Sequence, residues 1–159
     1  MRRVRGADWI AGAGGVALLA SLFTGWYSGA ALSAPGVGYA PLDLGLNGWQ
    51  AFSVLDLVLA LLALSPLALV ALQATRDSPS LPVAFSVLST VAGALALLLI
   101  LYRIVDQPGP NEAVEVELGA WLGLAAAAAM TAGGWRSMRV EAMPGVPPPA
   151  VEDLPAPAP

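Results

Sequence analysis

The residue best suited to chemistry in this sequence is Asp56, an ionisable side chain within a long apolar stretch. The stretch from Ser53 to Leu72 has the length and apolarity of a helix that spans a membrane. A carboxylate costs several kcal/mol in hydrocarbon, so this side chain is expected to face protein or a water-filled crevice instead of lipid. Asp56 is therefore the first candidate for an intramembrane polar site.

Two kinds of partner are expected for Asp56. Arg103 ends a later apolar stretch, so in an antiparallel pair of helices it would lie at a similar depth and could form a charge-assisted pair with Asp56. The alternative is a protonated Asp56 that bonds a hydroxyl or water, and the available hydroxyls are those of Ser86, Ser89 and Thr90. Their spacing of three and four predicts one helix face. Such hydroxyls more often join helices than line a conducting path.

Residue types that are missing exclude several other chemistries. The chain has no cysteine and no histidine, which excludes disulfides, thiol chemistry and histidine acid-base catalysis. The acidic residues of 103–117 lack the regular register of a calcium loop and predict a solvated loop. No catalytic residue, metal site or cofactor is predicted, and the chain is not expected to be an enzyme. A formal charge of −4 without a basic patch gives no indication of nucleic-acid binding.

Composition indicates an integral membrane protein of the all-α class. Hydrophobic residues make up 57% of the chain and charged residues 11%, with a mean hydropathy of +0.72. Four apolar stretches predict a four-transmembrane-helix bundle over residues 1–140, with the lipid bilayer as its solvent. The predicted spans are about 9–27, 52–72, 81–102 and 118–135. Residues 141–159 are rich in proline and are predicted to be a disordered tail.

Small residues spaced by four predict two helix-packing faces. The first span contains Ala13, Ala17, Ser21 and Gly25, and the fourth contains Gly119, Gly123 and Ala127. Because the first span follows arginines and precedes small residues, a cleaved signal peptide is the alternative interpretation of it. In the second span Pro66 removes a backbone hydrogen bond. We expect Ser65 or a neighbouring helix to satisfy the carbonyl that Pro66 frees.

The distribution of arginine predicts the topology. A cytoplasmic N-terminus would place all but one of the arginines inside, with Arg103 alone outside, and this asymmetry is typical of membrane proteins. Both termini are therefore expected to be cytoplasmic. The inner arginines are Arg2, Arg3, Arg5, Arg76, Arg136 and Arg139.

Three segments carry a resemblance to a known group. GLNGWQAFSVLDLVLALLAL, YRIVDQPGPNEAVEVELGAWLGLAAA and GGWRSMR resemble parts of small, uncharacterised four-helix membrane proteins of high-GC, actinobacterial-type bacteria. The resemblance covers residues 1 to about 140. It implies the four-helix architecture and a bacterial inner membrane, and it implies no activity.

Two functions from different classes are consistent with these patterns. The first is a structural or accessory membrane protein that packs against itself, as a homo-oligomer, or against a membrane-protein partner. The second is a small transporter or channel in which Asp56 binds a cation or a proton. The first is favoured because the other spans contribute hydroxyls but no relay of ionisable groups.

Overall fold

The computed structural model describes residues 6–29, 45–75, 82–107 and 114–142, and most of these are helical. The prediction of an all-α protein is confirmed, and a small sheet is added to it. In chain order the elements are α1 (Gly6–Ser21), β1 (Gly25–Ser28), β2 (Leu46–Asn47), α2 (Gly48–Ala51), α3 (Leu55–Thr75), α4 (Pro82–Val105), β3 (Glu115–Val116) and α5 (Leu118–Ala142). The predicted tail lies outside the described residues, apart from the last two residues of α5.

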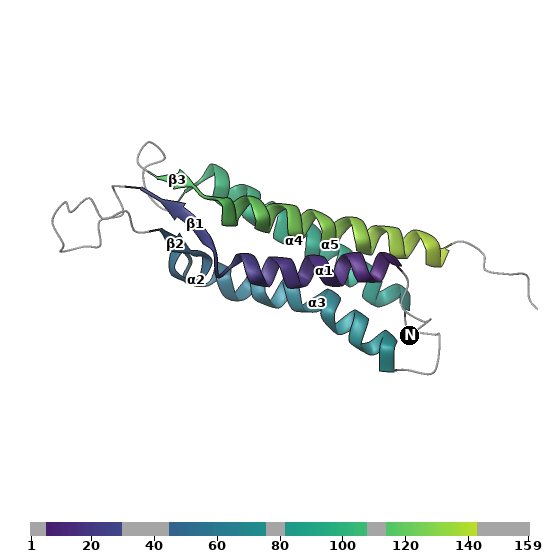
Figure 1. Cartoon of the computed structure of the whole chain (residues 1–159). Coiled ribbons are helices and arrows are strands. Elements are labelled where there is room, and N and C mark those ends of the chain that lie inside the picture. The colour runs from purple at the N-terminus through teal and green to yellow at the C-terminus, as the bar shows by residue number, and fades with distance from the viewer. Residues whose placement is uncertain (1–5, 30–44, 76–81, 108–113, 143–159) are drawn as a thin grey trace, which may run out of the picture.

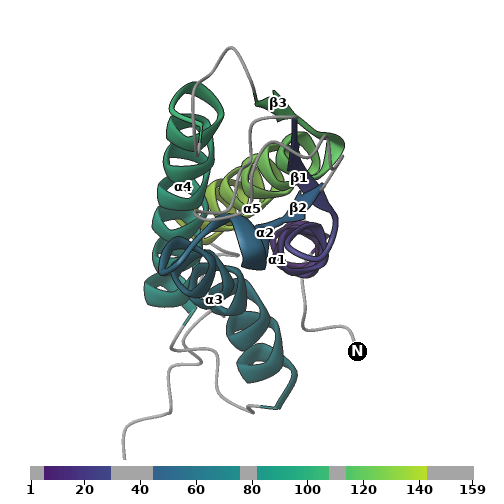
Figure 2. The same ribbon diagram turned by 90° about the vertical axis from the view of Figure 1, so that its left-hand side faces the viewer.

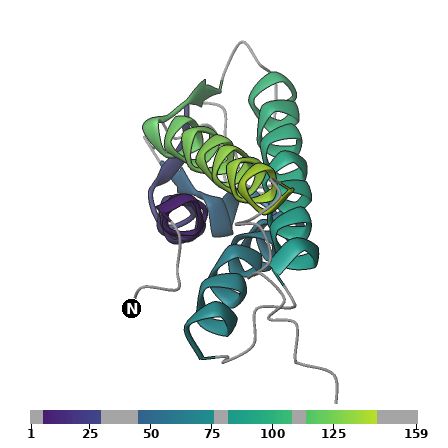
Figure 3. The same cartoon turned by 90° about the vertical axis from the view of Figure 1, so that its right-hand side faces the viewer.

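Four long helices lie alongside one another and form what we call the helical body (Figure 1). α5 packs against α1 and α4, and α3 packs against the same two helices. The views along the helices show that α1, α3, α4 and α5 surround a common centre (Figures 2 and 3). Within the described residues, two stretches are long and apolar enough to cross a membrane, Ser86–Val105 of α4 and Leu118–Arg139 of α5.

The first predicted span is wrong at its C-terminal end. The helix α1 ends at Ser21, and the chain turns before it enters β1 at Gly25. The turn is stabilised by two side chains that donate hydrogen bonds to the Ser21 carbonyl oxygen, the Thr24 hydroxyl at 2.7 Å and the Trp26 indole at 2.6 Å. Because these donors bind the end of α1, Trp26 and Tyr27 belong to a strand instead of the helix.

A three-stranded antiparallel sheet covers one end of the helical body, in the order β2-β1-β3. Tyr27 of β1 pairs with Leu46 on one side and with Val116 on the other. The Ser28 hydroxyl donates a hydrogen bond to the Glu117 carboxylate at 2.5 Å. The segment 103–117, which we expected to be a solvated loop, therefore supplies the paired strand β3, whereas residues 30–44 and 108–113 lie outside the described residues.

Buried residues in the helical body alternate at spacings of three and four. This is the spacing of helices that pack at shallow angles in bundles. The stripe is Asp8, Ala11, Gly15 and Leu18 in α1; Asp56, Leu59, Ala63 and Pro66 in α3; Ser86, Ser89, Gly93, Ala96 and Ile100 in α4; and Gly119, Gly123, Ala126, Met130, Gly133 and Ser137 in α5.

Several of these stripes meet through backbone contact at glycine. A Cβ placed on Gly133 of α5 would lie 2.5 Å from the backbone nitrogen of Ala11, and one on Gly15 would lie 2.5 Å from the carbonyl oxygen of Ala63. Gly119, Gly123 and Ala127 of the predicted packing face of α5 are buried. The packing face predicted for the first span differs from this. Ser21 is buried, but Ala13 and Ala17 of α1 are exposed. Gly25, the fourth member, is exposed in β1.

The reason is the position of the true interface, which is displaced by one or two residues from a strict spacing of four. Gly14 and Gly15 of α1 face α5 and α3 respectively, so Ala13 and Ala17 point away from both.

The expectation for Pro66 is confirmed. It lies inside α3, and the Ser65 hydroxyl donates to the carbonyl oxygen of Leu62 at 2.8 Å, which is the acceptor that proline cannot serve.

Replacing Gly15 by valine is predicted to destabilise the helical body. The new side chain would overlap the Ala63 carbonyl and the Pro66 ring, both of which are backbone or rigid atoms, so α1 and α3 must separate. We expect a loss of about 1–3 kcal/mol, typical of overpacking, measured as a lower melting temperature in detergent. Ala13→Val is the control, because Ala13 is exposed. Equal melting temperatures for the two variants would contradict this packing.

Candidate functional site

The end of the helical body beside the sheet holds an aromatic cluster, which comprises Trp26, Tyr27, Phe52 and Arg103. Trp26 and Tyr27 meet the Phe52 ring edge-on, with ring centroids 5.3 and 6.0 Å apart and interplanar angles of 87° and 89°. The Arg103 guanidinium lies 5.1 Å from the centre of the same ring. Edge-to-face and cation–π contacts of this kind stabilise both the aromatic pairs and the half-buried Arg103 cation. The cluster therefore joins β1, the segment before α3 and the end of α4.

Tyr27 also makes a polar contact across this cluster. Its hydroxyl donates a hydrogen bond of 2.8 Å to the main-chain oxygen of Arg103, and the side chain is fully buried. Burial raises the pKa of the Tyr27 phenol above 10.0, although the nearby Arg103 guanidinium opposes the change. The phenol therefore stays neutral and keeps its proton for the hydrogen bond at ordinary pH.

Asp56, the leading candidate from the sequence, is buried in the first turn of α3. Its Oδ1 accepts a 2.8 Å hydrogen bond from the backbone N–H of Leu57. A carboxylate at a helix N-terminus is favoured by the unpaired N–H groups and the helix dipole. Within the described residues no ion pair joins Asp56 to Arg103. The Asp56 carboxylate accepts from Leu57 of its own helix, and the Arg103 guanidinium lies on the Phe52 ring.

A second polar group, the serine–aspartate cluster, lies at the opposite end of the helical body and comprises Asp8, Ser86 and Ser137. The Ser137 hydroxyl of α5 donates a 2.6 Å hydrogen bond to the carboxylate of Asp8 in α1. The Ser86 hydroxyl of α4 donates in turn to the Ser137 oxygen, at 3.4 Å. All three side chains are at most 1% exposed. Three helices are thus joined by one buried chain of hydrogen bonds.

The predicted hydroxyl face of α4 belongs to this cluster and not to Asp56. Thr90 and Arg103 are thirteen residues apart, which is about 20 Å along a helix, so Ser86, Ser89 and Thr90 lie far from the Asp56 end. The Thr90 hydroxyl donates to the Ser86 carbonyl oxygen at 2.7 Å. The buried Ser89 hydroxyl has no partner among the described residues. The structure therefore separates the five residues of the predicted polar site into two groups.

Asp8 and Ser137 were not predicted because both lie just outside the predicted spans. A signal for them exists in the spacing. Asp8 precedes Ala11, Gly15 and Leu18 by three, seven and ten residues, and these residues are buried. Ser137 follows Met130 and Gly133 by seven and four residues in the same way. Asp8 and Ser137 are thus the polar last members of two buried helix faces, and each lies one or two residues beyond a predicted span.

The geometry of the serine–aspartate cluster favours structure over chemistry. An aspartate beside a serine hydroxyl could in principle activate a nucleophile. Here neither oxygen reaches the surface, since Ser137 is 0% and Asp8 is 1% exposed. A substrate has no access to them, and their hydrogen bonds serve to hold α1, α4 and α5 in register.

Comparison with known proteins adds no relative to this description. No protein-family model, curated protein or solved structure matches the chain. The resemblance to small actinobacterial-type membrane proteins therefore stays a prediction from the sequence.

The hydrogen bond between Ser137 and Asp8 is predicted to couple the two residues energetically. Ser137→Ala removes a hydrogen-bond donor from the buried Asp8 carboxylate and should cost about 1.5–3 kcal/mol. The Asp8→Asn/Ser137→Ala double variant should lose less than the sum of the single variants, by about 1 kcal/mol or more. Chemical denaturation in detergent measures the free energy of unfolding of the unmodified protein, of Asp8→Asn, of Ser137→Ala and of the double variant. Ser21→Ala is the control, since its hydroxyl bonds only Leu18 of its own helix, and additive losses for Asp8 and Ser137 would contradict the coupling.

Alkaline pH is predicted to destabilise the aromatic cluster through Tyr27. The phenol pKa is raised in the folded protein, so the stability from its protonated form is complete below pH 10 and falls as the pH rises toward the folded-state pKa. We expect melting temperatures to fall more steeply above pH 10 for the unmodified protein than for Tyr27→Phe. Tyr102→Phe is the comparison variant. The 2.6 Å hydrogen bond to the Asp106 carboxylate also raises the pKa of the Tyr102 phenol, but this side chain is exposed, so its removal should change the curve less than Tyr27→Phe does. Parallel curves for the unmodified protein and Tyr27→Phe would exclude this role.

Proposed function

We propose that the chain is a four-helix integral membrane protein with both termini in the cytoplasm. The support is the surface of the helical body. Large apolar side chains are exposed on all four long helices, among them Ile10, Val16, Leu57, Leu61, Leu64, Val87, Leu88, Val91, Leu95, Leu98, Leu101 and Leu122. Soluble monomers rarely expose contiguous apolar surface of this extent. A bilayer would cover it without cost.

Aromatic side chains mark the two ends of this apolar surface. Trp9 and Trp135, 60% and 56% exposed, lie within two residues of Asp8 and Ser137, which are hydrogen-bonded at the end where α1 begins. Trp121 and Tyr102, 52% and 59% exposed, lie at the end that carries the sheet, because Trp121 is in the first turn of α5 after β3 and Tyr102 precedes Arg103, which Tyr27 of β1 contacts. Exposed tryptophan and tyrosine at two levels are typical of the two membrane interfaces. The helix α1, with 16 residues, is about 24 Å long and is short for a span, so its neighbours would define the membrane thickness.

Within this membrane setting we propose a structural or accessory role, in which the chain packs with a second copy or with a partner membrane protein. The observation that carries this proposal is the contrast between the outer faces of α4 and α5. The face of α4 presents leucine and valine, whereas that of α5 presents Ala125, Ala128 and Ala132 between Trp121 and Trp135. In lipid, helices associate through close backbone contact at small residues. The α5 face is therefore suited to another helix and the α4 face to lipid.

The transporter hypothesis gains little from the geometry. Asp56 lies at one end of α3 and the serine–aspartate cluster lies at the other end of the helical body. Between them no ionisable side chain of the described residues is buried. A carrier of protons or cations needs ionisable groups near the middle of the membrane. The structural or accessory role is therefore favoured over the transporter or channel.

Cross-linking through single cysteines tests the packing role, because the chain has no native cysteine. We expect Ala128→Cys to form a disulfide-linked dimer on oxidation in membranes, or a heavier species when a partner protein with an accessible thiol is present. Leu98→Cys on α4 is the matched control, with an exposed position at a similar depth, and should remain monomeric.

Dilution separates association from random collision. The Ala128→Cys product should persist when the protein is reconstituted at a high lipid-to-protein ratio, with the partner included if one was captured. Equal cross-linking at the two positions, or none at Ala128, would overturn the packing role. The unmodified protein should also resist extraction from membranes by alkaline carbonate, and its release would overturn the membrane assignment itself.

A further inference from the structure

An exposed aromatic pair lies where α1 ends, at residues 22–24, which we call the α1–β1 turn. The Phe23 ring is 70% exposed, and it contacts the half-buried Trp49 of α2, with ring centroids 5.6 Å apart and an interplanar angle of 53°. α2 is fixed against the turn, because the Gly48 N–H donates a 2.9 Å hydrogen bond to the Leu22 carbonyl oxygen. The Phe23 ring is therefore held outside the helical body instead of packing into it.

The serine–aspartate cluster gives a common level from which positions along the helices can be compared, since its hydrogen bonds join α1, α4 and α5. Three exposed aromatic side chains lie 15 or 16 residues from the cluster member of their own segment. At the rise of a helix, this separation is about 22–24 Å. The three are Phe23 after α1, Tyr102 of α4 and Trp121 of α5. Phe23 thus lies at the level of the aromatic side chains that mark the membrane interface beside the sheet.

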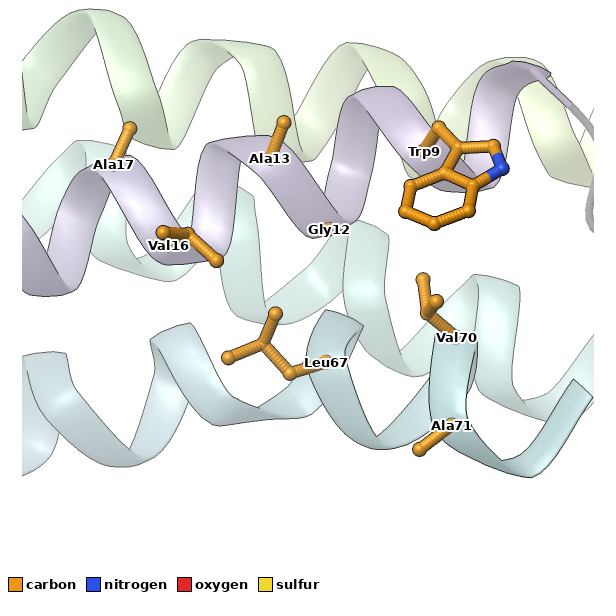
Figure 4. Close-up of a pocket in the computed structure, with 8 residues that line it drawn as sticks. All are labelled: Trp9, Gly12, Ala13, Val16, Ala17, Leu67, Val70 and Ala71. Carbon is orange, nitrogen blue, oxygen red and sulfur yellow. The ribbon is translucent and has the colours of Figure 1, made fainter. Parts of the chain in front are cut away.

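The start of α3 reaches the same level with an apolar side chain, Val54. At the other end of the two helices, Trp9 of α1 lies beside Val70 of α3 (Figure 4). Phe23 follows Trp9 by 14 residues and Val54 precedes Val70 by 16, so the two side chains differ in level by about 3 Å. Val54 is 66% exposed. The exposed apolar level therefore continues from the α1–β1 turn onto α3.

The backbone of the α1–β1 turn is satisfied by hydrogen bonds within the protein. The N–H groups of residues 22–24 each donate to the carbonyl oxygen three residues earlier, at 3.1–3.3 Å. The Ser21 carbonyl oxygen also accepts from the Thr24 hydroxyl and the Trp26 indole, and the Leu22 carbonyl oxygen accepts from the first residue of α2. Backbone at membrane depth needs such partners, because hydrocarbon supplies none. These groups of the turn therefore tolerate contact with lipid.

We propose that the α1–β1 turn and α2 lie in the headgroup region of the leaflet beside the sheet, with phospholipid as the partner of their exposed surface. The rings of Phe23 and Trp49 lie at the boundary with the acyl chains. α1 is about 24 Å long, shorter than a hydrocarbon core of about 30 Å, and the aromatic pair continues the apolar surface beyond its last residue. This inference rests on the proposed membrane location and not on packing with a second copy or a partner protein.

Single labelled cysteines test the position of the turn, because the chain has no native cysteine. Phe23→Cys and Val54→Cys full chains carry the fluorophore NBD in phosphatidylcholine–phosphatidylglycerol vesicles, and Val54→Cys leaves the Phe23–Trp49 contact intact. The quenchers are lipids with a nitroxide near the headgroup, lipids with a nitroxide near the chain end, and iodide on both sides of the membrane. At both positions we expect the shallow nitroxide to quench about twofold more than the deep one, with little quenching by iodide.

Labels at Glu115→Cys and Leu95→Cys are the references. Glu115 is exposed in β3 of the sheet, so its label should be quenched by iodide and by neither lipid. Leu95 is exposed on α4, nine residues from Ser86 and so midway to Tyr102, and its label should be quenched most by the deep nitroxide.

Three results would overturn the position of the turn while the Leu95 label still reports lipid. They are iodide quenching at positions 23 and 54 equal to that at Glu115, stronger quenching there by the deep nitroxide than by the shallow one, and protection from both lipid and iodide. The third result would indicate a protein partner on this surface. A Leu95 label that neither lipid quenches would instead overturn the membrane assignment, so the two failures are distinguishable.

Discussion

Backbone contact at the glycines of α5 is the constraint on which the rest of the structure depends. This helix packs against both α1 and α4, and it does so where a side chain is missing on one side of the contact. A Cβ on Gly134 would lie 2.5 Å from the Thr90 hydroxyl oxygen, and one on Gly93 would lie 2.7 Å from the backbone nitrogen of Thr131. Dispersion and weak polar contacts grow at such short range, and in lipid they replace the hydrophobic effect as the main force between helices.

Because the helices approach so closely, little room remains for ionisable side chains along the middle of the helical body. Among the described residues, the buried ionisable groups lie at its two ends instead. The serine–aspartate cluster joins α1, α4 and α5 at one end, and the aromatic cluster joins β1, α4 and the segment before α3 at the other. Hydrogen bonds fix the position of one helix along another better than apolar contacts do, because sliding a helix by one turn breaks them. The two clusters therefore set the register that the glycine contacts allow.

The outer surface follows from the same arrangement. With glycine and alanine turned inward, leucine and valine on α3 and α4 are left to face outward. On α5 the described outward face instead carries the small side chains Ala125, Ala128 and Ala132. Leucine and valine suit the acyl chains of a bilayer, and the alanine face suits the second helix that we propose packs there.

The sequence by itself determined the helical class, the hydroxyl face of α4 and the hydrogen bond from Ser65 that offsets Pro66. Each of these follows from local periodicity or from the covalent structure of proline, which act within a few residues. The tertiary structure decided what long-range contacts control. It ended α1 at Ser21, because Trp26 is drawn into a cluster with Phe52, and it exposed Ala13 and Ala17, because the interface falls on Gly14 and Gly15. It also linked Ser86 to Asp8 by hydrogen bonds through Ser137. The Asp56 carboxylate, in contrast, accepts a hydrogen bond from the backbone of its own helix. A pattern of spacing identifies which residues share a helix face, but only the packing of one helix against another decides which faces meet and at what depth.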